Sequence, residues 1–356
     1  MRENRLMPNS TGVLRVGVVG VGSFGRNHAR VYRELASEAS QRVEFTGIVD
    51  ADYANAKAVA SQFGTKAYVA LEELISAGVQ AVSVTVPTDA HLEVARQLMQ
   101  AGVDVLVEKP LATTLGEADE LIFLARQSGR VAQAGHLERF NPAVRATFSL
   151  ITKPMFFEVH RLSLFTPRSL DVDVVLDLMI HDIDIVLAFT NSPVKEIRAV
   201  GLPILSKKAD IANVRMELES GCVANFTASR VSTERVRKLR FFQPRQYISL
   251  DYSRRDVLVL SVAEQSPHTH EIDPFNPASM AAGAFAGITP YKPPVEQQEP
   301  LRAELSSFLR SVRERSRPEV TLEDGRRALA VALEIVDAIA EHNLRVHLQE
   351  LTQAGS

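Results

Sequence analysis

The chain has 356 residues, of which 46% are hydrophobic, and its formal net charge is −3. That length predicts two packed domains, and the slightly acidic balance argues against a nucleic-acid or membrane-surface partner. The single cysteine, Cys222, excludes an intrachain disulfide, as is typical of proteins of the reducing cytoplasm.

The chain begins with a polar segment, residues 1–12, which we expect to be a disordered tail. This segment has no apolar core of signal-peptide length. No later run reaches the roughly 18 apolar residues that a membrane helix needs. We therefore expect a cytoplasmic protein that has no membrane partner.

A glycine motif follows the first strand-like run, which starts at Arg15. The run ends in Gly20-Val-Gly22-Ser23-Phe24-Gly25, and a helical pattern continues to about Leu35. In a dinucleotide-binding fold the first glycine makes a tight turn, the second lets the backbone approach the pyrophosphate, and the third lets helix and strand pack closely. The helix N-terminus then faces the anion. The motif predicts a dinucleotide site that includes Ser23 and Phe24.

An acidic residue follows the second predicted strand, Val43–Val49. It is Asp50, which lies where a carboxylate would bind the ribose hydroxyls of adenosine. A carboxylate at this point repels the 2′-phosphate of NADP, and Ala51 and Asp52 supply no arginine to neutralise it. The sequence therefore favours NAD. Asp52 has a second interpretation as the cap of the following helix.

Strands and helices alternate up to Gly135, which predicts a doubly wound parallel sheet over residues 13–135. The further expected strands are 81–86, 103–107 and 131–134, and the expected helices are 53–63, 71–76, 90–101 and 115–128. Glycines stand where helix C-caps are expected, at Gly64, Gly78, Gly102 and Gly129.

Two of these strands end in polar residues, and ligands bind beyond the carboxyl ends of strands in such sheets. Pro87-Thr88 ends one strand, and His91 follows it with a role that is as readily structural as functional. Glu108-Lys109-Pro110 ends the next. Lys109 would lie beside the nicotinamide, where it can hold a substrate hydroxyl and assist its proton transfer. The alternative is a solvated lysine in a turn.

The pattern changes over residues 136–356, where strands follow one another with few helices between them. We expect an α+β domain with a large open, mainly antiparallel sheet, whose uncovered apolar face would require a homo-oligomer. The Pro-, Gly- and Ala-rich segment 274–300 is either an ordered excursion or a mobile loop. Two closing helices, 301–315 and 322–343, are expected to pack back toward the first domain.

A histidine and two carboxylates lie on one predicted helix, 173–189. Asp177 and His181 are four residues apart and share a face. A histidine with a carboxylate one turn away can serve as a general base with an orienting partner. The alternative is a polar helix face on which the two merely pair. With Asp184 they offer no convincing metal site, because no cysteine or second histidine stands nearby.

The junction between the two domains and one later strand carry further polar residues. The junction contains His136, Glu138, Arg139 and Asn141, the last of which can cap a helix that starts at Pro142. Arg230 begins a basic stripe that continues over Arg235, Arg237, Lys238 and Arg240. The stripe is either a solvated or interface surface, or a site for a phosphate-bearing substrate.

Taken together, these motifs resemble those of the Gfo/Idh/MocA oxidoreductases. The resemblance rests on the glycine motif, Pro87-Thr88, His91, Glu108-Lys109-Pro110 and the spacing of Asp177, His181 and Asp184. It implies a Rossmann domain, an oligomer-forming α/β domain and NAD(P)-dependent oxidation of a sugar or cyclitol. It also implies that Lys109, Asp177 and His181 form the catalytic set. One departure is Asp173-Val-Val-Leu, where many members have a glycine-rich approach.

Residues 135–142 and 228–243 further resemble a subgroup, the UDP-N-acetylglucosamine 3-dehydrogenases, which precede an aminotransferase in making a 3-amino sugar for lipid A. This resemblance implies oxidation of the C3 hydroxyl, with His136, Glu138, Arg139, Asn141 and Arg230 near the substrate. Either Lys109 or His181 could be the base. The alternatives are a dehydrogenase of a free sugar or inositol, and an NAD(P)-binding regulator without turnover.

Overall fold

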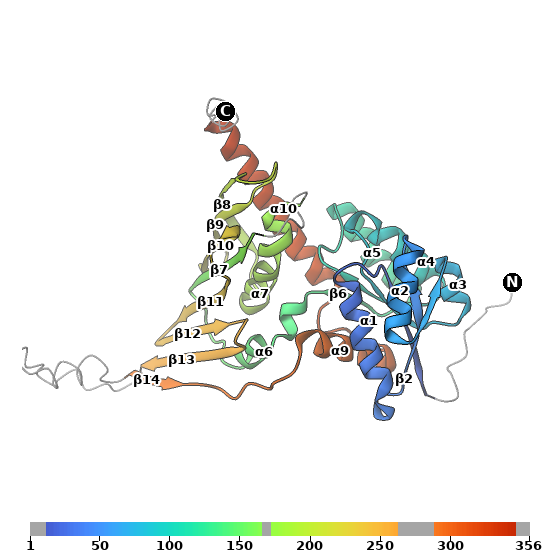
Figure 1. Cartoon of the computed structure of the whole chain (residues 1–356). Coiled ribbons are helices and arrows are strands. Elements are labelled where there is room, and N and C mark those ends of the chain that lie inside the picture. Colours follow the sequence, from blue (N-terminus) through green and yellow to red (C-terminus); the bar gives the residue numbers. More distant parts are fainter. Residues whose placement is uncertain (1–11, 166–171, 263–287, 347–356) are drawn as a thin grey trace, which may run out of the picture. The chain divides into compact units, whose positions relative to one another are not determined.

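The computed structural model describes residues 12–165, 172–262 and 288–346, so the expected tail lies almost entirely outside the described residues. The chain divides into two compact units (Figure 1). The first runs to Phe140 and includes Gln298–Ala330, and the second holds Asn141–Gln297 and the chain from Val331 onward. The division falls at Phe140 and not at Gly135, because the 3₁₀ turn Leu137–Phe140 packs against the helix Pro300–Glu314 of the first unit.

The first unit is built on a parallel sheet of six strands in the spatial order β3-β2-β1-β4-β5-β6. The strands are β1 (Leu14–Val19), β2 (Val43–Val49), β3 (Lys66–Tyr68), β4 (Ala81–Val84), β5 (Asp104–Glu108) and β6 (Ala132–Gly135). All strand pairs are parallel, so the carboxyl ends of the strands meet at one edge. This arrangement confirms the doubly wound sheet, although the short strand β3 was not among the expected strands.

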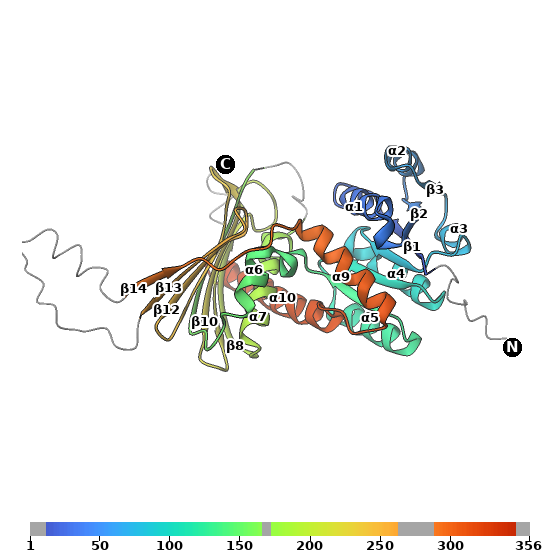
Figure 2. The same cartoon turned by 90° about the horizontal axis from the view of Figure 1, so that it is seen from below.

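Helices cover the sheet of the first unit (Figure 2). They are α1 (Gly25–Ser37), α2 (Tyr53–Phe63), α3 (Leu71–Ser76), α4 (His91–Gln100), α5 (Leu115–Ser128) and α9 (Pro300–Glu314). Gly64 and Gly129 close α2 and α5 in the left-handed conformation, with φ of 62° at each, as the sequence predicts. Helix α9 adds Leu305 and Phe308 to the core that contains Tyr32 of α1, so this unit is completed by a segment far away in the sequence.

The second unit contains an eight-stranded sheet in the order β14-β13-β12-β11-β7-β10-β9-β8. Its strands are β7 (Phe156–Leu164), β8 (Val194–Leu202), β9 (Ile211–Leu218), β10 (Val223–Ser232), β11 (Val236–Gln243), β12 (Gln246–Asp251), β13 (Asp256–Val262) and β14 (Ile288–Tyr291). Among the described strands of this sheet only β7 and β10 pair in parallel, so the sheet is mainly antiparallel, as expected. Strand β14 lies within the segment expected as an excursion or loop, of which residues 274–287 lie outside the described residues.

Helices of the second unit lie on one side of this sheet (Figure 2). They are α6 (Pro142–Phe148), α7 (Ile180–Thr190) and the later part of α10 (Leu322–Arg345). Side chains on the helix-covered side are buried, including the stacked pair Phe157 and Phe241. The expected helix 173–189 is not α-helical throughout, because Val175–Met179 forms a π-helical segment before α7 begins.

Candidate active site

The glycine motif of the first unit forms a tight loop between β1 and α1. Gly20 has φ of 85°, in the left-handed region, which an L side chain adopts with difficulty. A Cβ atom at Gly25 would lie 1.9 Å from the Gly20 carbonyl oxygen, so only glycine allows helix and strand to approach this closely. Gly22 faces open space, with no atom within 4 Å of a Cβ placed there. The loop therefore leaves room for a pyrophosphate at the N-terminus of α1.

Asp50, at the end of β2, is held beside this loop. Its carboxylate accepts a hydrogen bond from the Val21 backbone N–H at 2.6 Å and another from the Asp52 N–H at 2.9 Å. Asp52 caps α2 by accepting the N–H groups of Ala54 and Asn55, which confirms the capping interpretation. Asp50 is thus oriented by the backbone on both sides, and its half-buried carboxylate remains available to ribose hydroxyls. The exposed ring of Phe24 and exposed Ser23 belong to the same loop.

The end of β4 is joined to the loop after β5 by His91, which is 1% exposed. One ring nitrogen of His91 lies 3.0 Å from the Val86 carbonyl oxygen, and the other lies 3.1 Å from that of Pro110. Burial lowers the pKa of His91, and the backbone hydrogen bonds oppose that effect. His91 therefore positions the segment of Pro87 and Thr88 relative to the segment of Pro110, and it would influence a cofactor through them.

The end of β5 combines a half-buried lysine with a buried glutamate. Glu108 is 6% exposed, and one of its carboxylate oxygens lies 3.1 Å from Nε2 of His28 on α1. The other oxygen accepts the Lys109 backbone N–H at 3.2 Å. The Glu304 side chain of α9 is fully buried, and burial raises its pKa well above the ordinary value, with Glu108 as the second cause. Lys109 thus follows a buried cluster of acidic groups, and the sequence pattern gave no indication of Glu304.

Asp177 and His181 belong to the second unit. Asp177 lies in the π-helical segment and His181 in the first turn of α7, and both side chains are half-buried. A π-helical turn is often found at functional sites. Asp173, which precedes it, accepts the Val175 N–H at 2.9 Å, and burial raises its pKa.

The same helix carries a buried ion pair that no motif suggested. Asp182 of α7 accepts two hydrogen bonds from Arg161 of β7, at 2.6 and 2.9 Å, and both side chains are almost completely buried. Asp184 is 2% exposed and faces the interior. The Arg161–Asp182 pair fixes α7 on the sheet, and hence the face that presents His181.

The residues at the junction are mostly buried. His136 and Glu138 of the first unit are 1% and 8% exposed, and Arg139 is half-buried. Burial raises the pKa of Asp324 on α10, but hydrogen bonds from Thr321 and the charge of Arg139 outweigh burial, so that this pKa is lowered. Asn141 begins the second unit as the N-cap of α6, where it accepts the Ala143 N–H, and it also donates to the Tyr252 carbonyl oxygen. The capping role of Asn141 is therefore confirmed.

Arg230 is buried in the second unit, with 5% of its surface exposed. Its guanidinium donates to the Val172 carbonyl oxygen and lies 3.7 Å from Asp210. These contacts connect β10 to the segments of Val172 and Asp210, so Arg230 has a structural role in addition to any contact with a substrate. Along β11 the basic side chains alternate between the two faces of the sheet. Arg237 is in register with buried Arg161 of β7 and shares its face, whereas Lys238 and Arg240 lie on the opposite face.

The described residues contain neither a candidate metal site nor a candidate membrane-spanning helix. Within the described ranges no group of three or more His, Cys, Asp or Glu could hold a metal ion. No helix in the described parts of the chain combines the length and apolar character needed to cross a membrane.

Comparison with known proteins identifies relatives of both units. Residues 14–136 match the model of an oxidoreductase family with an NAD-binding Rossmann fold, GFO_IDH_MocA, and residues 153–245 match the GFO/IDH/MocA C-terminal domain. The chain is 34% identical to UDP-N-acetylglucosamine 3-dehydrogenase of Acidithiobacillus ferrooxidans, over 92% of this chain and 97% of that protein.

Two further similarities extend this result. A solved structure of the Acidithiobacillus ferrooxidans enzyme superimposes with a TM-score of 0.80 at 33% identity, covering 92% of this chain and 97% of the other. A scyllo-inositol 2-dehydrogenase (NAD(+)) of Bacillus subtilis is 25% identical over 62% of this chain and 68% of its own length. The similarity to the first enzyme extends over both units, and the similarity to the second is weaker and shorter.

Proposed function

The chain belongs to the Gfo/Idh/MocA family of NAD-dependent oxidoreductases that act on CH–OH groups, and we propose that it oxidises UDP-N-acetylglucosamine at C3 to the 3-keto sugar. The observation that carries this proposal is the 34% identity to a UDP-N-acetylglucosamine 3-dehydrogenase over 92% of the chain. The resemblance of the segments 135–142 and 228–243 to that subgroup supports the same assignment.

The residues of the first unit fit the cofactor. The open space at Gly22 and the oriented carboxylate of Asp50 match a pyrophosphate and an adenosine ribose. When bound, NAD supplies the hydride acceptor. Lys109, at the carboxyl edge of the sheet, would then lie on the nicotinamide side, where its ammonium group would stabilise the alkoxide that develops on the substrate.

The residues of the second unit supply the proton acceptor. In this proposal His181 removes the proton of the C3 hydroxyl, and Asp177 orients the imidazole and stabilises its protonated form. Arg139 and Arg230 are the candidate donors to the oxygens of the nucleotide sugar, with His136, Glu138 and Asn141 placing the segment that contains Arg139. The keto product would pass to an aminotransferase of lipid A synthesis in the cytoplasm.

The test is NADH formation by the full-length protein with UDP-N-acetylglucosamine, free N-acetylglucosamine and myo-inositol. We expect the nucleotide sugar to have the highest kcat/KM, because the diphosphate contributes binding energy. Arg230→Ala should raise KM for it and leave NAD binding unchanged. Equal or better oxidation of a free sugar or inositol would reject the substrate assignment and leave a free-sugar or inositol dehydrogenase.

The proposed catalytic roles are tested separately. Lys109→Ala and His181→Ala should each reduce turnover on the order of 10²–10⁴-fold, while the affinity for NAD, measured by fluorescence titration of NADH, stays close to that of the parent. Near-normal turnover in either variant would remove that residue from the catalytic set. A parent protein that binds NADH but oxidises none of the three compounds would instead favour a regulator without turnover.

A further inference from the structure

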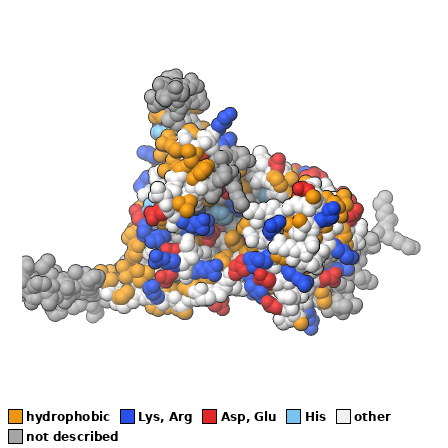
Figure 3. Space-filling view, in the orientation of Figure 1, with side chains coloured by type: hydrophobic (Ala, Val, Ile, Leu, Met, Phe, Trp, Pro, Cys, Tyr) orange, Lys and Arg blue, Asp and Glu red, His pale blue; other side chains and the backbone are white. Residues whose placement is uncertain are grey.

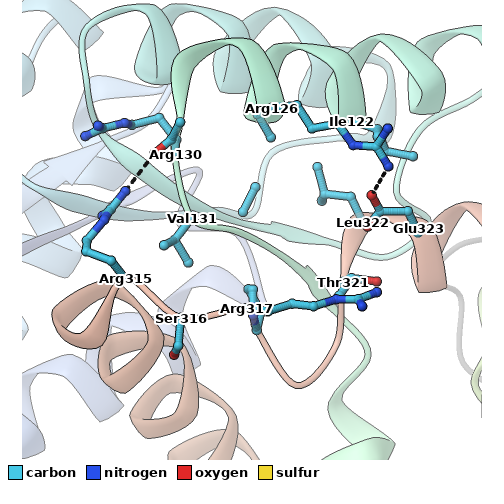
Figure 4. Close-up of a pocket in the computed structure, with 14 residues that line it drawn as sticks. Ile122, Arg126, Arg130, Val131, Arg315, Ser316, Arg317, Thr321, Leu322 and Glu323 are labelled. Atoms are coloured by element: carbon cyan, nitrogen blue, oxygen red, sulfur yellow. Dashed lines mark hydrogen bonds and ion pairs between the residues drawn. The ribbon is translucent and has the colours of Figure 1, made fainter.

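The first unit contains a hollow away from the glycine motif. Its volume is about 410 Å³, and its lining comes from the end of α5, the start of β6, the end of α9 and the start of α10 (Figure 4). Because the strands are parallel, the start of β6 lies at the amino edge of the sheet, whereas Gly20, Asp50 and Lys109 follow carboxyl ends. The hollow is therefore separate from the dinucleotide site.

The hollow is cationic. Arg126, Arg130, Arg315 and Arg317 contribute to its lining, against one acidic residue, Glu323. Arg126 and Glu323 form an ion pair of 2.7 Å, but their side chains are 72% and 41% exposed, so this pair opens at little cost.

The remaining arginines differ in how many of their donor groups already make hydrogen bonds or ion pairs. The Arg315 guanidinium lies 2.5 Å from the carboxylate of Asp104 and donates to the Gly129 carbonyl oxygen. Arg130 donates to two backbone carbonyl oxygens, those of Ser128 and Gly102. Arg317 is exposed and has no hydrogen bond or ion pair with any described residue. Arg317 thus remains as a donor for an anion, and Arg126 becomes a second donor when its exposed pair with Glu323 opens.

The rest of the lining sets the class of ligand. Ile122, Val131, Pro318 and Leu322 form an apolar wall beside the arginines. A volume of about 410 Å³ falls within the range of roughly 300–1,000 Å³ that is typical of sites for small organic ligands. Guanidinium groups bind phosphate oxygens in a two-pronged geometry. The combination fits a phosphate or diphosphate group held by the arginines, and the apolar wall can contact an organic body that carries it.

The start of α10 connects this hollow to the end of β5. Thr321 and Glu323 belong to the lining, and Gly325 follows in the first turn of the helix. A Cβ at Gly325 would lie 3.3 Å from the Leu111 side chain and 2.9 Å from that of Ala134, so helix and loop are in close contact. Leu111 stands two residues after Lys109. A displacement of the start of α10 would therefore shift Leu111 and, through the backbone, Lys109.

We propose that this hollow binds a phosphate-bearing small molecule, and that its occupancy changes turnover through the first turn of α10 and the loop of Lys109. The site uses none of the residues assigned to NAD or substrate. Binding at this hollow therefore does not depend on the substrate assignment, whereas its effect on turnover rests on the proposed dehydrogenase activity.

Calorimetric titration of the full-length protein with inorganic pyrophosphate, at saturating NADH, tests the site. NADH occupies the dinucleotide site, so remaining saturable binding reports other positions. We expect Arg317→Ala to weaken this binding on the order of 10-fold, as for the loss of a hydrogen bond to a charged group. The matched control is Arg33→Ala, which removes another exposed arginine of the first unit. It should bind pyrophosphate as the parent does.

The coupling is tested by the rate of NADH formation with and without pyrophosphate. A change in kcat or KM that disappears in Arg317→Ala and persists in Arg33→Ala would support it. Absence of saturable binding, or equal affinity of the parent and Arg317→Ala, would overturn the site. If Arg317→Ala loses pyrophosphate binding, but pyrophosphate leaves the turnover of the parent unchanged, the coupling would be overturned.

Discussion

We expect cofactor choice to depend most directly on Asp50. Its carboxylate is oriented by the N–H groups of Val21 and Asp52, so it would meet a ribose without reorganisation. Asp50→Ala should weaken NAD binding by on the order of 10-fold or more, because it removes charge-assisted hydrogen bonds to the hydroxyls. It should weaken NADP binding far less, since the repulsion of the 2′-phosphate is removed as well. Titration of NADH and NADPH fluorescence measures both.

Asp52→Ala supplies the control for this substitution. Asp52 is two residues away and caps α2, so its loss should cost about 0.5–2 kcal/mol of stability with no change in the NAD-to-NADP ratio. Equal weakening of both cofactors by Asp50→Ala, or a parent that prefers NADP, would contradict the role given to Asp50.

Glu304 gives the stability of the protein a predictable dependence on pH. Its pKa is raised by burial and then by Glu108, and Tyr32 faces it from α1. Folding therefore keeps Glu304 protonated where the unfolded chain would ionise it. The stability that protonated Glu304 contributes is complete below its pKa in the unfolded chain, near 4.5. It is lost at about 1.4 kcal/mol per pH unit as the pH rises toward the pKa of Glu304 in the folded protein.

The neutral variant Glu304→Gln removes this titration. Urea unfolding between about pH 5 and about pH 8 should show a smaller loss of stability with rising pH in Glu304→Gln than in the parent. Glu314→Gln, which replaces an exposed glutamate of the same helix, should retain the parent's slope. Identical slopes in the parent and Glu304→Gln would show that Glu304 is ionised in the folded protein.

Elements with strong local signals were predicted well. The helices α2, α3 and α5 coincide with their expected limits. Capping residues mark both ends of α2 and α5, and an apolar period marks α3. Strand β3 has three residues, which is too short for an alternation to be recognised. The π-helical segment leaves the apolar period nearly unchanged, so the sequence resembled that of an α-helix.

Contacts between elements were harder to predict than the elements themselves. Arg161 and Asp182 are 21 residues apart, and Glu304 meets Glu108 through α9, which returns from the far end of the chain. Neither pair has a spacing that indicates contact. The candidate NAD residues could be identified because the glycine motif and Asp50 follow directly from strand ends.

Two glycines at the junction of β1 and α1 have different roles, one in packing and one in leaving space for the cofactor. Gly25→Ala would place a Cβ 1.9 Å from the Gly20 carbonyl oxygen and 2.6 Å from the Thr85 hydroxyl. Helix and strand must then move apart, and we expect a loss of about 1–3 kcal/mol in thermal or urea unfolding. Gly22→Ala meets no atom within 4 Å, so the protein should keep its stability and lose NAD affinity, because the methyl group occupies space of the pyrophosphate.

The two substitutions serve as controls for each other. If Gly22→Ala destabilised the protein as much as Gly25→Ala, the space beside Gly22 would not be open. If Gly22→Ala left the affinity for NADH unchanged, the pyrophosphate would lie elsewhere than over this loop.

On the scale of the whole molecule, no helix of the described residues covers the second side of the sheet in the second unit. Helices cover one side, and on the other the strand register aligns an apolar row across β7, β11, β12 and β13. The row consists of Phe156, Phe242, Tyr247 and Leu260. Phe242 is 38% exposed, and its ring lies 5.8 Å from that of Phe156 and 5.2 Å from that of Tyr247. Hydrophobic side chains also reach the surface over β13 and β14 (Figure 3).

We expect this apolar row to be the centre of a homo-oligomer, a dimer or a tetramer, because a contiguous exposed apolar patch of this kind favours burial against a second copy. Light scattering at micromolar concentration should give a mass above the 39.2 kDa of one chain. Phe242→Asp should shift the protein toward monomers, since it places a charge in the buried centre of the interface.

The control is Lys195→Asp, which changes an exposed side chain of β8 that forms an ion pair with Glu217. This substitution should leave the mass unchanged. A parent that remains monomeric would show that the open sheet is stable in water, and loss of the oligomer in Lys195→Asp alone would place the interface on β8 instead.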